Sequence, residues 1–163
     1  MEWINPDAGA TKKPTTASLR ISGLIKIPGN FQINGFADGV DYAGVGTMYV
    51  DGDCYFGNSL MPTAGLVFPY DAALGMVVGQ NLNLSTGPGD AQIQMAGAFY
   101  AQGIVKSAKQ NDILGTFVAN FFDMGSQVPN IYQVPVLKDL LPPVMPGDKK
   151  YYSLQVKTWR QRK

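Results

Sequence analysis

The sequence contains no histidine and a single cysteine, Cys54, in 163 residues. Without histidine, the chain lacks the commonest general base, the usual catalytic triads and a ligand of most zinc sites. One cysteine excludes an internal disulfide, and we expect Cys54 to be buried as a small apolar residue rather than exposed as a reactive thiol. The sequence therefore predicts a protein that is not an enzyme and that carries no metal or other cofactor.

Charged residues are also scarce, at 15% of the chain against roughly 25% in a typical soluble domain. The net charge of +1 indicates no partner by itself, but the charge is uneven. From position 149 onward the basic residues are Lys149, Lys150, Lys157, Arg160, Arg162 and Lys163, and no acidic residue accompanies them. We expect a solvated tail; the alternative is a binding site for an anionic surface or DNA.

Long apolar runs are absent as well. No run approaches the about 20 residues of a membrane-spanning helix. The first residues lack the basic start and apolar stretch of a signal peptide. If the protein works outside the cytoplasm, we therefore expect this chain to be a fragment or to have lost its export signal.

What the chain does contain is a recurring local pattern, in which an apolar residue and one spacer precede a glycine. The six glycines of this pattern are Gly23, Gly35, Gly52, Gly79, Gly97 and Gly115. The last two steps are 18 residues each. Short β-branched and aromatic runs with period-two alternation surround the glycines. A unit this short, built of strand-like residues, predicts stacked coils in which equivalent residues lie above one another.

We therefore predict an all-β fold, a single-stranded parallel β-helix (β-solenoid) with coils of about 18 residues and a proline-rich C-terminal cap. A β-sandwich is the alternative, because its short strands look similar in sequence. The step from Gly52 to Gly79 is too long for one coil, so we expect a loop around residues 59–65 to leave the stack.

The predicted organisation has three parts: a flexible lead-in at 1–17, the solenoid at 18–125, and a capping segment with the basic tail at 126–163. The proline density after Gly125 is incompatible with central strands and indicates an extended segment packed along the stack. Within this segment Tyr151–Trp159 alternates again, and we expect it to form a final strand.

Other candidate sites are weak when each is compared with a simpler explanation. Four aspartates have the short spacing of calcium ligands, but no complete calcium loop is present and aspartate is common in turns. They are Asp38, Asp41, Asp51 and Asp53. Paired carboxylates could cleave glycosides, yet the later repeats carry mainly amides where acids would be needed. Gly87-Pro88-Gly89 lacks the lysine and helix of a phosphate loop and is expected to be a turn.

Aromatic side chains and a methionine at outward positions form another candidate binding face. These residues are Tyr42, Tyr49, Tyr55, Met61, Tyr70 and Tyr100. Scattered surface aromatics are the equally simple alternative.

From Gly97 onward the sequence resembles type IV pilus assembly proteins of the PilX type, which are minor-pilin-like. The segments that carry the resemblance are Gly97–Gly103, Ile113–Asn120, Val128–Tyr132, Pro142–Gly147 and Trp159. The resemblance implies an extracellular or cell-envelope protein that acts in pilus assembly, adhesion or nucleic-acid uptake. It implies other pilus subunits, or a partner chain with a hydrophobic helix, as partners, and it brings no catalytic residues.

Together these features predict a non-enzymatic structural or binding protein of the cell surface, a pilus-associated subunit or its soluble portion. Two alternatives stay open. The first is a bactofilin-like scaffold whose copies stack end to end, and the second is a carbohydrate-active β-helix enzyme.

Overall fold

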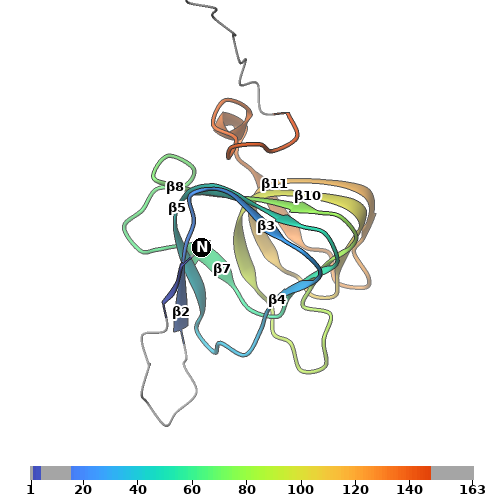
Figure 1. Ribbon diagram of the computed structural model, residues 1–163. Helices are drawn as coiled ribbons and strands as arrows, with labels where there is room; N and C mark the ends of the chain where they lie inside the picture. Colours follow the sequence, from blue (N-terminus) through green and yellow to red (C-terminus); the bar gives the residue numbers. More distant parts are fainter. Residues whose placement is uncertain (1, 5–15, 148–163) are drawn as a thin grey trace, which may run out of the picture.

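The computed structural model describes residues 2–4 and 16–147 (Figure 1). These residues form twelve β-strands in one connected sheet, followed by a short 3-10 helix. Of the twelve pairings among these strands, eleven are parallel, and only that of β1 with β2 is antiparallel. The predicted all-β fold with parallel strands is confirmed. No helix in the described part of the chain is long and apolar enough to cross a membrane.

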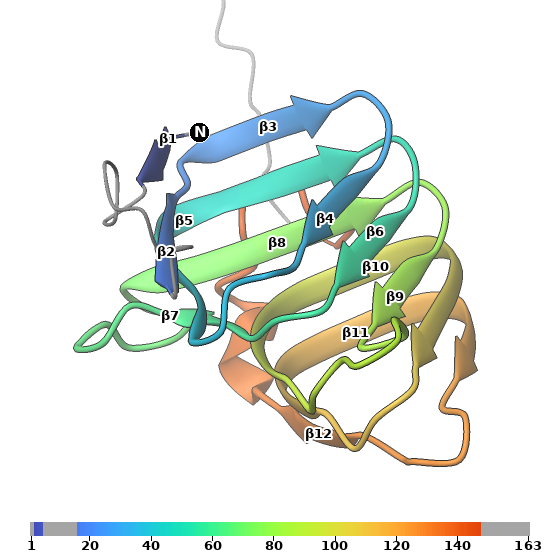
Figure 2. The same ribbon diagram turned by 90° about the horizontal axis from the view of Figure 1, so that it is seen from below.

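The strands follow one another in successive passes, and each pass pairs with the one before it (Figure 2). Their bounds are β1 (Glu2–Ile4), β2 (Thr16–Arg20), β3 (Gly23–Ile27), β4 (Phe31–Ile33), β5 (Gly39–Val50), β6 (Cys54–Phe56), β7 (Leu60–Pro62), β8 (Ala72–Val78), β9 (Leu82–Leu84), β10 (Gln94–Ser107), β11 (Asp112–Asp123) and β12 (Asn130–Gln133).

The pairings define three sides of the stack. Side 1 contains β2, the first part of β5, β7, the starts of β10 and β11, and β12. Side 2 contains β3, the second part of β5, β8 and the middle of β10 and β11. Side 3 contains β4, β6, β9 and the ends of β10 and β11. Strands of one side lie next to each other along the stack although they are far apart in the sequence.

The strand register corrects the predicted repeat length. The spacing of 18 residues holds at the end of the stack, where Gly97 pairs with Gly115 and Ile113 pairs with Ile131. Earlier passes are longer, because Val50 pairs with Val78 and Val78 pairs with Ala101. Connections of different length join strands that stay in register, so a fixed repeat in the sequence is not required.

The glycines of the recurring pattern therefore do not all stack on one another. Gly97 lies beside Leu74, and the prediction that Gly79 stacks on Gly97 is wrong. Gly52 donates a backbone hydrogen bond to Gly29, rather than stacking on Gly35. Gly52 and Gly79 follow the ends of β5 and β8, whereas Gly97 lies within β10. The apolar-spacer-glycine pattern therefore does not mark equivalent positions in these passes.

Interior side chains form columns that run through the stack. On side 3, Cys54 lies between Phe31 and Leu82, and it is fully buried, as the sequence predicts. Phe99 belongs to the column of another side, because it pairs with Met76 on side 2. Burial raises the pKa of the Cys54 thiol well above its usual range, which keeps the thiol protonated and unreactive.

The loop expected between Gly52 and Gly79 is displaced along the sequence. Residues 60–62, predicted as loop, form β7 and pair with β5. The connection that leaves the stack follows β7 and covers residues 63–71. It exposes three apolar side chains, Leu66, Val67 and Tyr70.

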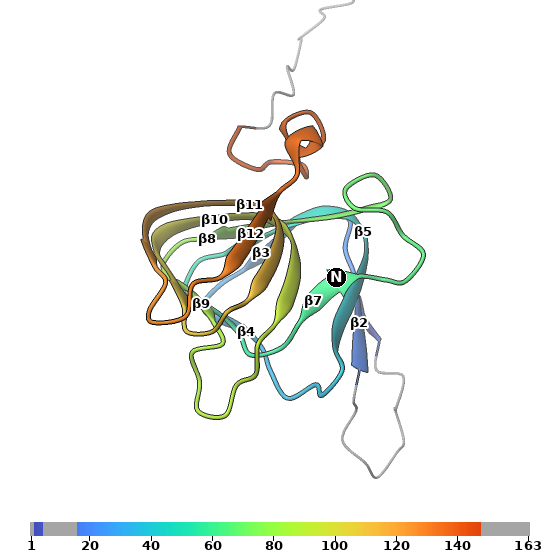
Figure 3. The ribbon, with the colours of Figure 1, turned by 180° about the vertical axis from the view of Figure 1, so that it is seen from behind.

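The proline-rich segment packs along the stack, as expected. Residues 134–147, which we call the strap, include the 3-10 helix η1 (Pro135–Lys138) and lie outside side 2 (Figures 1 and 3). Met145 is buried against Val77 and Ala98, and the Thr47 hydroxyl donates a hydrogen bond to the Pro143 carbonyl. The strap therefore covers the side of the stack.

The described part of the predicted cap covers only some of the stack's end. β12 pairs with the first four residues of β11. Within residues 2–4 and 16–147, the second half of β11 pairs on one edge only, with β10. The basic tail and the predicted final strand Tyr151–Trp159 lie outside the described residues.

Gly75 provides a test of the strap. A Cβ added there would lie 2.6 Å from the Thr47 hydroxyl and 2.7 Å from the Met145 sulfur. We expect Gly75→Ala to displace Met145 and to lower the free energy of unfolding by about 1–3 kcal/mol, the usual cost of overpacking. Urea unfolding measures the loss, and tryptic cleavage after Lys138 reports release of the strap.

Met145→Ala is the matched background for this substitution. If Met145 is the group that must move, Gly75→Ala costs less in the Met145→Ala protein than in the original chain. An equal cost in both backgrounds would mean that Met145 is not the group that has to move, and would assign the cost to the Thr47 hydroxyl.

Candidate functional site

Side 3 carries a row of polar side chains on its outer surface. The register places one such residue in each pass, directly above the last. We call this set the polar column; its members are Gln32, Tyr55, Asn83, Lys106 and Asp123. Each is partly or fully exposed, whereas its neighbours along the middle strands are buried. Because paired strands lie about 4.8 Å apart, the column is a straight, closely spaced row of hydrogen-bonding groups.

A second row at the adjoining corner fixes the backbone beneath the column. The Asn30 Oδ1 atom accepts a hydrogen bond from the Asp53 backbone N–H at 2.9 Å. Asp53 Oδ1 in turn accepts from the backbone and side-chain N–H groups of Asn81, at 2.9 and 3.0 Å. Asn81 Oδ1 accepts from the Ile104 backbone N–H at 3.0 Å. Each side chain thus binds the backbone of the next pass, and we call these three residues the corner ladder.

Tyr55 is the aromatic member of the column, and its position is fixed at both ends. Its hydroxyl donates a hydrogen bond to Asp90 Oδ2 at 2.6 Å, and the Gly87 backbone N–H donates to the same oxygen at 2.7 Å. A side chain at Gly57 or Gly87 would collide with the hydroxyl. The ring therefore extends along the sheet surface toward the loop that contains Asp90, instead of projecting away from the sheet.

The environment of Tyr55 also keeps its hydroxyl protonated. Burial, followed by the hydrogen bond to the Asp90 carboxylate, raises the pKa of Tyr55 to about 12. A phenol with this pKa is neutral at physiological pH and donates a hydrogen bond to Asp90. The segment Gly87-Pro88-Gly89 that shapes this environment forms a turn, as the sequence predicts, and the Asp90 N–H donates to the Gly87 carbonyl.

Two hollows open on the polar column. One, of about 380 Å³, is lined by Asn30, Phe31, Gln32, Asp53 and Tyr55. Further along the stack, a hollow of about 230 Å³ is lined by Asn81, Asn83, Ile104, Lys106 and Asp123. Both combine members of the column with members of the corner ladder, so amide and charged side chains line both spaces.

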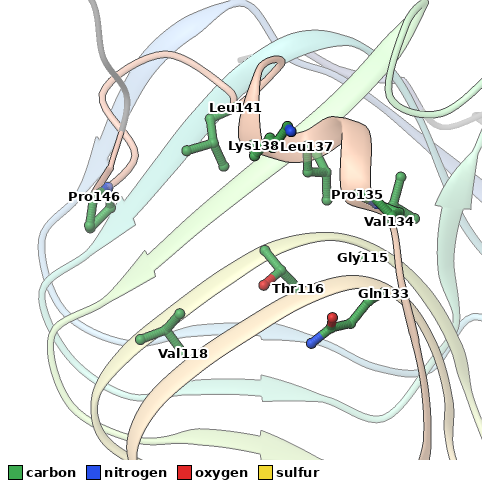
Figure 4. Close-up of a pocket in the computed structure, with 10 residues that line it drawn as sticks. All are labelled: Gly115, Thr116, Val118, Gln133, Val134, Pro135, Leu137, Lys138, Leu141 and Pro146. Atoms are coloured by element: carbon green, nitrogen blue, oxygen red, sulfur yellow. The ribbon is translucent and has the colours of Figure 1, made fainter.

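A separate groove lies between the strap and β11 (Figure 4). It has a volume of about 320 Å³, and its lining is mostly apolar, with Thr116, Gln133 and Lys138 as the polar side chains. Lys138 ends the 3-10 helix η1, and Val118 of β11 is exposed at the opposite wall. Among the described residues that line this groove, none carries a carboxylate.

Two of the four aspartates considered as calcium ligands make other contacts. Asp51 forms an ion pair with Lys26 at 3.3 Å, with both side chains largely exposed, and Asp53 belongs to the corner ladder. Asp41 lies on side 1, opposite Met61. Among the described residues, no three histidine, cysteine, aspartate or glutamate side chains come together as a metal site.

The expected aromatic face is divided over the molecule. Tyr42 is fully buried, and its hydroxyl donates a hydrogen bond to the Ala96 carbonyl inside the stack. Burial raises the pKa of Tyr42 far above its usual value. Tyr49 and Tyr100 pack at the strap, and Tyr70 is exposed in the loop after β7. Tyr55 alone of this set lies on the polar column, and the predicted binding residues of the basic tail are outside the described part of the chain.

Sequence reasoning missed the polar column as a set. Gln32 and Tyr55 are 23 positions apart, as are Asn83 and Lys106, so the 18-residue repeat does not align them. The available signal was the recurrence of asparagine and aspartate before short strands, at Asn30, Asp53 and Asn81.

Searches against protein-family models, curated proteins and solved structures found no match to this chain.

Proposed function

We propose that the chain is a short β-solenoid that acts as a non-enzymatic binding protein of the cell surface, associated with type IV pili as a subunit or its soluble portion. The stacked parallel passes support the solenoid classification, with coils of 18 residues only at the C-terminal end. In this proposal the stack is a rigid scaffold and its outer surface contacts the partner.

The observation that carries the binding role is the polar column with its corner ladder. Polar groups recur in register across five passes, and the corner-ladder hydrogen bonds join the backbones of the first four of these passes beneath them. A surface fixed in this way loses little conformational entropy when it binds, which favours recognition.

The positions of the acidic residues favour binding over glycoside cleavage. Asp53 and Asp123 lie three passes apart on side 3, which corresponds to about 14 Å at the usual strand spacing. Glycosidase carboxylates are about 5–9.5 Å apart. Asp90, the acid nearest to Tyr55, already accepts hydrogen bonds from Tyr55 and Gly87.

The cell-surface and pilus assignment is supported by the sequence resemblance from Gly97 onward. That stretch corresponds to β10, β11, β12 and the strap. It includes the in-register pair Gly97 and Gly115, which is the most regular part of the stack. The proposed partners are other pilus subunits or a partner chain that supplies a hydrophobic helix.

Localisation in the source organism tests this assignment. Antibodies against the chain are applied to intact cells, to sheared surface filaments and to the cytoplasmic fraction. We expect the antibodies to label intact cells and the chain to be recovered with the sheared pili. In a strain without pili, we expect both signals to be lost. Recovery in the cytoplasmic fraction as filaments would overturn the proposal and favour the bactofilin-like scaffold.

A further inference from the structure

We propose that the polar column is a binding site for a linear, uncharged glycan that lies along the axis of the stack. This inference rests on the proposed function as a binding protein and names the ligand class of that surface.

The first argument is the shape of the surface. The five members of the column follow one another at about 4.8 Å, a distance close to the length of one sugar ring. The two hollows lie next to each other on the same row, because Gln32 and Tyr55 line the first and Asn83, Lys106 and Asp123 line the second. An extended chain of sugar rings can therefore occupy both hollows while it follows a single straight path.

The second argument is the chemistry of the groups. Amides such as those of Gln32 and Asn83 both donate and accept hydrogen bonds, as sugar hydroxyls do. Tyr55 adds a ring held along the sheet surface by Asp90, which provides an apolar platform for the C–H face of a sugar. A protein interface would instead be expected to concentrate apolar and aromatic anchors at its centre.

The third argument is charge. The acidic side chains that line the two hollows are Asp53 and Asp123, and the basic one is Lys106. Asp90 adds a third carboxylate, at the Tyr55 hydroxyl. Nucleic acids and other polyanions require a surplus of basic groups along their path. The balance on this surface disfavours a polyanion and suits an uncharged polymer.

The test measures binding of the purified chain to four uncharged hexasaccharides, cellohexaose, chitohexaose, maltohexaose and laminarihexaose, by titration calorimetry. Single-stranded DNA and a heparin oligosaccharide are the charged comparisons. We expect at least one uncharged hexasaccharide to bind, and Tyr55→Ala to weaken it by about tenfold or more through loss of the aromatic platform. Tyr55→Phe keeps the ring and is expected to weaken binding less.

Tyr132→Ala is the matched control, because Tyr132 is an exposed tyrosine on β12, away from side 3. We expect the Tyr132→Ala variant to bind the hexasaccharide with the same affinity as the original chain. Thermal unfolding confirms that each variant is folded. The inference is overturned if no hexasaccharide binds, if Tyr55→Ala binds as well as Tyr132→Ala, or if only the polyanions bind. Because localisation is measured separately, surface labelling without glycan binding would reject this inference and leave the proposed function standing.

Discussion

Gly115→Ala is expected to destabilise the protein by about 3 kcal/mol, one of the largest effects of any single substitution in this chain. Gly115 has a φ of +137°, where a side chain is strained, and a Cβ there would collide with the Gly97 carbonyl oxygen of the neighbouring pass. The oxygen belongs to a paired strand and cannot move without disturbing the pairing of β10 with β11. Urea unfolding, followed by circular dichroism, measures the loss.

Gly89→Ala separates the collision from backbone strain. Gly89 also has a positive φ, of +81°, but an added Cβ would meet no atom within 4 Å. Its replacement is therefore expected to cost only the strain, about 1–2 kcal/mol. If Gly115→Ala lowers the free energy of unfolding no more than Gly89→Ala does, β10 and β11 do not approach each other as closely at Gly115 as the structure shows.

Phe99→Ala is expected to cost about 3–5 kcal/mol, because it leaves a cavity in the middle of the interior column of side 2. Phe99 is 1% exposed, and its ring stacks on that of Phe117 with centroids 4.5 Å apart. Phe99 also pairs with Met76 on the preceding pass. Loss of the ring thus removes contacts to two passes at once. Thermal and urea unfolding both report the change.

Phe121→Ala is the control for this substitution. Phe121 lies on the next pass but its side chain is 61% exposed, so its removal is expected to change stability by less than about 0.5 kcal/mol. Similar decreases in the free energy of unfolding for Phe99→Ala and Phe121→Ala would contradict the assignment of Phe99 to the interior.

The strand content of this fold could be predicted from local pattern, but the register could not. Period-two alternation identifies the strands, and the 18-residue step correctly pairs Gly97 with Gly115. Earlier passes have longer connections, including residues 63–71 between β7 and β8. The length of a loop does not change the alternation of apolar and polar residues within the strands. The sequence therefore does not indicate which residues of successive passes pair with each other.

The candidate site depends on register and was therefore the harder part to predict. The sequence alone indicates Tyr55 only as one of several outward aromatic residues, and Asp53 only as a candidate calcium ligand. Their shared surface becomes visible once Gln32, Tyr55 and Asn83 are seen to stack. The function of Asp53 in the corner ladder depends on Asn81, 28 positions later.

The stacked register that builds the polar column is tested most directly by a disulfide between neighbouring passes. Asn83 and Lys106 are paired neighbours on β9 and β10, and paired strands lie at about 4.8 Å, within the Cα separation that a disulfide spans. In a Cys54→Ala background, Asn83→Cys with Lys106→Cys is expected to cross-link on mild oxidation, as detected by intact mass. The strict 18-residue repeat would instead bring Pro88 to Lys106. Cross-linking of Pro88→Cys with Lys106→Cys, and none between positions 83 and 106, would contradict the register and with it the polar column.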